Sequence, residues 1–126
     1  MHTLAFRTSN VTIANACLEL IAHATTPCRI REIGMTQVTA VATVIGLGQP
    51  AAIGVTPTTP LTSLKEDSEL PDGGTTGAVA WGTGPTVPAQ FLRRVAFPGT
   101  IGAGVIWGWD KRDELIVIPG SGLVLW

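Results

Sequence analysis

The sequence predicts an all-β protein, built as an antiparallel β-sandwich or barrel, and three observations support this fold class. The 15 glycines and 9 prolines fall between short apolar runs rather than inside long ones, as expected where turns connect strands. The runs are rich in Val, Ile, Thr and Trp, which strands favour. In residues 28–34, Cys28 and Ile30 share one face and Arg29 and Arg31 the other, which is the period of a half-buried strand.

Ten short strands are predicted within a chain of 126 residues, a length typical of one domain. In chain order they cover residues 2–7, 10–14, 17–23, 28–35, 40–47, 77–82, 90–97, 104–109, 114–118 and 122–126. Residues 15–24 also fit a short helix, because Leu18, Ile21 and Ala22 have helical spacing. We favour a strand there, since a Thr-Thr-Pro turn and the run 28–35 follow as in a hairpin.

The register of that hairpin bears on the two cysteines. Setting Glu19 opposite Arg31 pairs unlike charges, whereas the neighbouring register sets Glu19 opposite Glu32. The first register keeps Cys17 and Cys28 apart, which predicts two reduced, structural thiols.

Residues 49–76 form the one long segment without a strand pattern, rich in Pro, Thr and Gly. Structureless loops of this length are uncommon in compact domains and often form interfaces. Pro57 and Pro60 stiffen the segment, so we expect either an arm with a fixed path that contacts a neighbour or a surface loop.

The charge pattern excludes two classes of partner. Only 13% of residues are charged and the net charge is −1, so no basic field attracts nucleic acid or an acidic membrane. No apolar run is long enough to span a bilayer, and residues 1–10 lack a signal-peptide pattern.

Charges gather in 65–72 and 110–114, while 33–64 has none. Low charge with an apolar surplus predicts that part of the surface is covered by other subunits.

Catalytic, cofactor and metal sites are not predicted. The histidines are His2 and His23, and no serine lies in a G-x-S-x-G elbow. No C-x-x-C or H-x-x-x-H spacing occurs. Gly99, Gly102 and Gly104 precede a β-branched, aromatic run rather than a helix, so they indicate turns and not a phosphate loop.

The adjacent arginines and the tryptophans are candidates either for ligand binding or for packing. Arg93 and Arg94 are adjacent, so in a strand they point to opposite faces and form no single basic patch. Trp107 and Trp109 share a face; with Trp126 they predict packing in a core or interface, and binding of a sugar is the alternative.

Three stretches, "CRIREIGMTQVTAVATVIGLGQPAA" (28–52), "FLRRVAFPGTIGAGVIWGW" (91–109) and "IVIPGSGLVLW" (116–126), together resemble small β-sandwich structural proteins of tailed bacteriophages. The resemblance covers most of the chain outside the long loop. It implies a jelly-roll-like antiparallel β-sandwich with one long irregular loop, whose last strand follows a Pro-Gly-Ser-Gly turn into the core.

The same resemblance implies a role in the virion. Proteins of this type decorate, or cement, phage heads, often as trimers at three-fold positions. We therefore expect a non-enzymatic capsid decoration protein, made in the host cytoplasm, whose partners are the major capsid protein and itself as a homotrimer. A carbohydrate-binding module and a tail or tail-tip component are the alternatives. The expected partner contacts are Met1, His2, Thr3, Leu4, Gln49, Pro50, Ile53, Pro57, Pro60 and Leu64.

Overall fold

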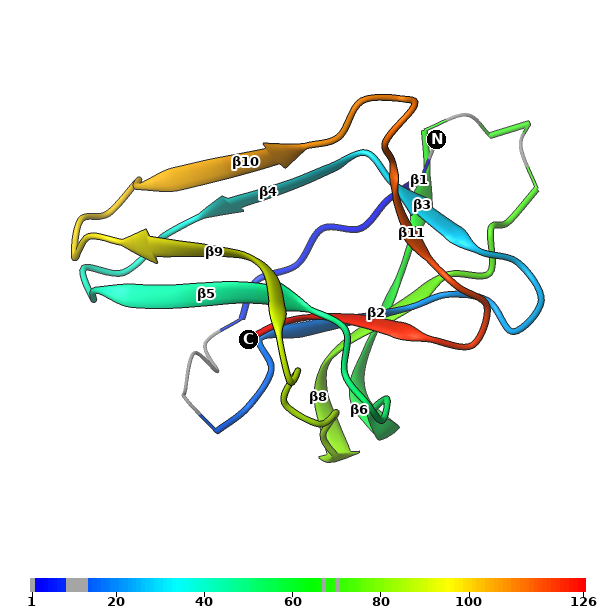
Figure 1. Cartoon of the computed structure of the whole chain (residues 1–126), viewed down its shortest axis with the longest axis horizontal. Helices are drawn as coiled ribbons and strands as arrows, with labels where there is room; N and C mark the ends of the chain where they lie inside the picture. The colour runs from blue at the N-terminus through cyan, green and yellow to red at the C-terminus, as the bar shows by residue number, and fades with distance from the viewer. Residues whose placement is uncertain (1, 9–13, 67, 70) are drawn as a thin grey trace.

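The computed structural model describes residues 2–8, 14–66, 68–69 and 71–126, and all regular elements in these ranges are strands (Figure 1). The predicted all-β, antiparallel fold is confirmed. The strands are His2–Thr3 (β1), Leu18–Ile21 (β2), Cys28–Ile30 (β3), Glu32–Thr36 (β4), Thr43–Gly48 (β5), Val55–Thr62 (β6), Leu64–Lys65 (β7), Thr76–Thr83 (β8), Phe91–Phe97 (β9), Gly104–Gly108 (β10), Leu115–Val117 (β11) and Gly122–Leu125 (β12).

The strand pairs are nested along the chain. Strand β2 pairs with β12, β3 with β11, β4 with β10, β5 with β9, and β6 with β8, all antiparallel. The first half of the chain therefore runs back along the second as one long ribbon. The ribbon winds so that β12 also pairs with β5 and β8 with β2, which makes a sheet in the order β6-β8-β2-β12-β5-β9. Nested pairing of this kind is the strand order of a jelly roll.

The hairpin predicted between 17–23 and 28–35 is wrong. Strand β2 is hydrogen-bonded on both edges, to β12 and to β8, so it has no free edge for β3. Glu19 therefore lies opposite Val124 and Ala78, and not opposite Arg31. The strand preference over a helix at 15–24 holds for 18–21, and both cysteines are free thiols as predicted.

Part of the segment predicted to be irregular forms strands. Within 49–76, residues 55–62 form β6 and 64–65 form β7, so the expectation of one continuous loop is wrong there. Strand β6 is at the edge of the large sheet, and its register shifts between Pro57 and Thr59 and between Thr59 and Pro60. An edge strand with such irregularities tolerates proline, because its outer N–H groups need no partner in the sheet.

Other boundaries differ modestly from the expectation. The predicted strand 2–7 is short, because only His2 and Thr3 pair. The predicted strand 10–14 lies outside the described residues except for residue 14, which is in a turn. The run 28–35 is divided into β3 and β4 at Arg31, whose carbonyl oxygen accepts a hydrogen bond from the Trp109 N–H at 2.8 Å.

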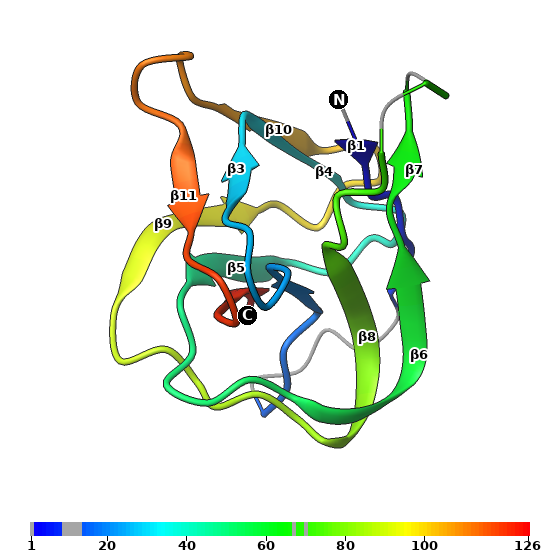
Figure 2. The same ribbon diagram turned by 90° about the vertical axis from the view of Figure 1, so that its right-hand side faces the viewer.

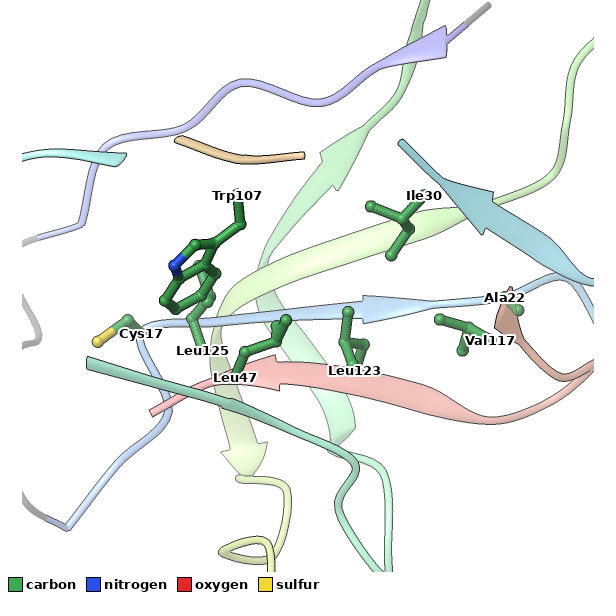
Figure 3. Close-up of a cluster of buried hydrophobic side chains, with 8 residues drawn as sticks. All are labelled: Cys17, Ala22, Ile30, Leu47, Trp107, Val117, Leu123 and Leu125. Carbon is green, nitrogen blue, oxygen red and sulfur yellow. The ribbon is translucent and has the colours of Figure 1, made fainter. Parts of the chain in front are cut away.

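The core lies between the large sheet and the strands β3, β4, β10 and β11 above it (Figures 1 and 2). Its buried residues are Cys17, Ala22, Ile30, Leu47, Trp107, Val117, Leu123 and Leu125, and Figure 3 shows Trp107 above Leu47 and Leu125. All four residues of β12 are buried. The last strand therefore enters the core, as the resemblance implied.

Two glycines with positive φ lie in turns that connect consecutive strands. Gly102 (φ 87°) lies between β9 and β10, and Gly120 (φ 71°) lies between β11 and β12. Side chains are strained at these angles, whereas glycine is not. The "PGTIGA" stretch (98–103) is thus a strand-to-strand turn, as predicted, and β10 follows it directly.

Substitutions in β5 test the two faces of this sheet. Leu47 is 1% exposed in the core, and Val44 is 59% exposed on the outer face. We expect Leu47→Ala to lower the free energy of unfolding by about 2–5 kcal/mol. Val44→Ala, in the same strand, is the control and should change it by no more than about 0.5 kcal/mol. Urea unfolding measures both, and similar losses for the two variants would contradict the assigned faces.

Candidate partner-binding surface

Two of the segments predicted to contact a partner come together on one surface. In β1 and β7, His2 lies opposite Lys65 and Thr3 opposite Leu64 (Figure 2). All four residues are exposed, and Leu64 is 70% exposed. We call these four residues the contact ribbon. Met1, also a predicted contact, lies outside the described residues.

The contact ribbon is held by polar contacts at its base. The Thr3 hydroxyl donates a hydrogen bond to the Glu66 carboxylate. Lys65 Nζ forms an ion pair with Asp72 Oδ1 at 3.0 Å. Each of these contacts joins groups that are at least partly exposed, so each contributes little to stability on its own. Both contacts join the contact ribbon to residues that follow β7, and neither covers Leu64, which is 70% exposed.

The remaining predicted contacts are divided between solvent and the protein's own sheet. Gln49, Pro57 and Pro60 are exposed. Leu4 and Pro50 are half-buried, and Ile53 is 36% exposed. These three side chains are partly covered because they pack against glycines of the large sheet. A Cβ on Gly77 would lie 2.8 Å from Leu4, and one on Gly122 would lie 3.0 Å from Ile53 and 3.5 Å from Pro50. Residues 49–54 therefore cover the face of the large sheet that points away from the core.

A buried carboxylate attaches this covering segment to the sheet. Glu19 in β2 is 0% exposed, and the backbone N–H of Gly54 donates to its Oε1 at 3.1 Å and to its Oε2 at 2.9 Å. No ion pair to Glu19 is formed within the described ranges. Burial raises the pKa of Glu19, while the hydrogen bonds from the Gly54 N–H oppose that shift.

Glycine is required on both sides of this carboxylate. A Cβ on Gly54 would come within 2.7 Å of Glu19 Oε2 and 2.3 Å of Trp81, and one on Gly122 would come within 2.8 Å of Glu19 Oε1. The Trp81 Nε1 is buried without a hydrogen-bond partner. Sequence reasoning missed this contact because it placed Glu19 in a local hairpin. The nearest signal was a lone acidic residue in an otherwise apolar strand.

The rings of Trp107 and Trp109 are covered by other parts of the chain. Trp107 is 7% exposed and lies in the core, so its ring offers no open face to a sugar. Trp109 is half-buried, and the Arg93 guanidinium lies over its ring at 4.8 Å. Trp126 is half-buried and exchanges backbone hydrogen bonds with Gly46 at 2.7 and 2.8 Å.

The paired arginines behave as the strand period predicts. In β9, Arg93 pairs with Leu47, which faces the core, and Arg94 pairs with Gly46 on the opposite face. Arg93 stacks on Trp109, while Arg94 stacks on the Phe91 ring at 4.6 Å. Neither forms an ion pair within the part of the chain that the structure describes. They therefore lie on opposite sides of the sheet edge and form no single basic patch.

Arg29 in β3 and Arg31 just after it both contact Glu114, which ends the β10–β11 turn. Glu114 accepts from Arg31 Nε at 2.8 Å and from Arg29 at 3.3 Å. The hydrogen bond from Arg31 chiefly holds the pKa of Glu114 below its ordinary value. His23 Nδ1 contacts the Thr25 hydroxyl at 3.0 Å. These contacts are structural, and they bring together no nucleophile, base and orienting group.

The described residues contain little that resembles a reactive site. They include no group of three or more His, Cys, Asp or Glu side chains placed to hold a metal ion. One shallow hollow lies over the β4–β10 pair, lined by Gly34, Met35, Thr36, Gly104, Val105 and Ile106. None of these lining side chains titrates. Within the same ranges the chain forms no helix of the length and hydropathy that a membrane span requires.

Comparison of the chain with protein-family models, curated proteins and solved structures found no match.

The buried Glu19 predicts a specific pH dependence. Its pKa is raised on folding, so the folded protein favours the neutral acid, and stability should increase as pH falls from neutrality toward the ordinary value of 4.5. We expect Glu19→Gln to remove this dependence and to be at least as stable as the wild type at pH 7. The measurement is the urea midpoint between pH 5 and pH 8.

Glu114→Gln is the matched control, because the pKa of Glu114 is lowered and not raised. It should leave the trend between pH 5 and pH 8 in place, since its own contribution is lost only as pH falls below its unfolded value of 4.5. A wild-type protein whose stability is flat or declines between pH 8 and pH 5, with Glu19→Gln behaving identically, would show that folding does not raise the pKa of Glu19.

Proposed function

We propose that the protein is a virion structural protein of the capsid decoration (cement) type, a homotrimeric jelly roll that binds across neighbouring major capsid subunits. The observation that carries the proposal is the contact ribbon. It joins the two segments expected to contact neighbours, the N-terminal segment and the 49–76 segment, on one exposed surface. Within it, Leu64 is 70% exposed, and covering such an exposed apolar side chain with a partner is favourable.

The mechanism is mechanical rather than chemical. The nested ribbon supplies a body in which each strand is hydrogen-bonded to a distant part of the chain, so the surface is held in place before a partner arrives. Such preorganisation lowers the entropic cost of binding. A subunit that attaches to two capsid subunits at once resists their separation, because the second contact is made at high effective concentration.

The carbohydrate-binding alternative loses its main support. A sugar platform requires an open aromatic face, but Trp107 is in the core and Arg93 covers Trp109. A role in the tail would use the same contact ribbon, so only the location of the protein on the virion separates it from a role on the head. Immunogold labelling of virions with an antibody to the protein distinguishes the two.

Co-sedimentation with undecorated heads tests the proposal. We expect the purified protein to be a trimer by light scattering and to sediment with heads at micromolar concentration. Leu64→Asp should weaken binding about 10- to 150-fold, the equivalent of losing one buried leucine.

Leu92→Asp is the control for this substitution, because Leu92 is also an exposed strand leucine (56%) and lies outside the contact ribbon. It should bind as the wild type does. A wild-type protein that stays in the supernatant would refute the proposed function.

A further inference from the structure

One end of the sandwich presents apolar side chains on two adjoining loops. The β4–β5 loop (37–42) and the β9–β10 loop (98–103) lie together at the left of Figure 1. Val38 is 49% exposed, Val41 61% and Ile101 67%, and Val44 at the start of β5 is 59% exposed. We call these four residues and their loops the apolar pole.

The two loops are fixed to each other by backbone hydrogen bonds. Gln37 N–H donates to Ala103 C=O at 2.7 Å, and Gly102 N–H donates to Gln37 C=O at 2.9 Å. The Gln37 side chain and the Thr43 hydroxyl both donate to Val41 C=O, the latter at 3.1 Å. The loops are thus held in one shape, so a partner that binds them has little loop entropy to offset.

The apolar pole is also the uncharged end of the molecule. The pole falls within two stretches, 33–64 and 95–109, that contain no charged residue. Strand β7, the turn between β10 and β11, and β3 with Arg29 lie toward the opposite end of the long axis (Figures 1 and 2). The molecule therefore has a charged end suited to water and an uncharged end suited to an apolar surface.

The size and shape of the apolar pole distinguish between two possible partners, a second copy of the chain and a concave surface on another protein. Three aliphatic side chains on two loops, with Val44 at the start of β5, offer on the order of a few hundred Å². A stable dimer of standard size buries about 800 Å² on each partner, so two poles meeting end to end fall well short. A recess that surrounds the loops also buries their flanks, where Ala40, Ala42 and Pro98 are exposed. The geometry favours a concave partner over a second copy.

We propose that the apolar pole is a second attachment end, which docks into an uncharged, apolar recess on a protein partner. This inference rests on the proposed function, under which the recess belongs to the capsid surface. The contact ribbon lies toward the other end of the long axis, so the pole and the ribbon would engage two neighbouring capsid subunits. The pole contact is apolar, so high salt should not weaken it, whereas charges beside the ribbon make that contact sensitive to salt.

A pair of isoleucine substitutions tests the pole. Ile101→Asp places a charge on the pole, and Ile118→Asp is the matched control, because Ile118 is a loop isoleucine of similar exposure (62% against 67%) in the connection between β11 and β12. Each purified variant is incubated with undecorated heads at low and at high salt, and the bound fraction is measured by co-sedimentation. Far-ultraviolet circular dichroism and light scattering confirm fold and oligomeric state.

We expect Ile101→Asp to weaken binding at least about tenfold at both salt concentrations, with Ile118→Asp bound as the wild type. Binding of Ile101→Asp equal to that of the wild type, while Leu64→Asp is impaired, would overturn the pole inference and leave the proposed function standing. Conversion of a wild-type trimer to a monomer by Ile101→Asp would assign the pole to a second copy and also overturn it. Failure of the wild type to bind heads would reject the proposed function itself.

Discussion

The burial of β12 on both faces is the constraint on which the rest of the structure depends. This strand is hydrogen-bonded to β2 on one side and to β5 on the other. Leu123 and Leu125 point into the main core, while Val124, with 0% exposure, points toward the opposite face. A central strand buried on both faces can exist only if something covers each face. The covering elements are β3, β4, β10 and β11 on one side and residues 49–54 with Trp81 on the other.

The covering of the outer face by residues 49–54 explains why a carboxylate is tolerated inside an apolar protein. Glu19 lies beside Val124 in the sheet and accepts hydrogen bonds from the segment that crosses it. Such a group costs free energy through desolvation, and its hydrogen bonds offset only part of that cost. In return the crossing segment is held at one defined place. Residues 55–65, which continue into β6 and the contact ribbon, therefore start from a fixed point.

Most strands were predictable from sequence, because alternation and turn residues are local signals. The pairing of those strands was not. A local hairpin between 17–23 and 28–35 has favourable charges, but β2 gains more by lying between β12 and β8, which are distant in sequence. Strand β6 was missed because Pro57 and Pro60 argue against a strand, and only its edge position makes them acceptable.

The candidate surface was predictable only in part. The exposed residues of β1 and β7 were singled out separately, and their pairing across more than sixty positions is not visible in the sequence. The absence of charge from 33–64 was visible. The stretch 33–64 lies beside the second uncharged stretch, 95–109, only because β4 pairs with β10 and β5 pairs with β9. The nested ribbon thus creates the apolar pole as well as the core.

An electron cryo-microscopy reconstruction of heads incubated with the protein tests the central claim most directly. The claim is that a rigid jelly roll attaches to the capsid by both ends of its long axis. The account predicts density for each subunit lying across two capsid subunits, with loops 37–42 and 98–103 seated in a recess of one and strands β1 and β7 against its neighbour. Undecorated heads, or subunits that stand on the charged turn between β10 and β11 with the apolar pole in solvent, would contradict it.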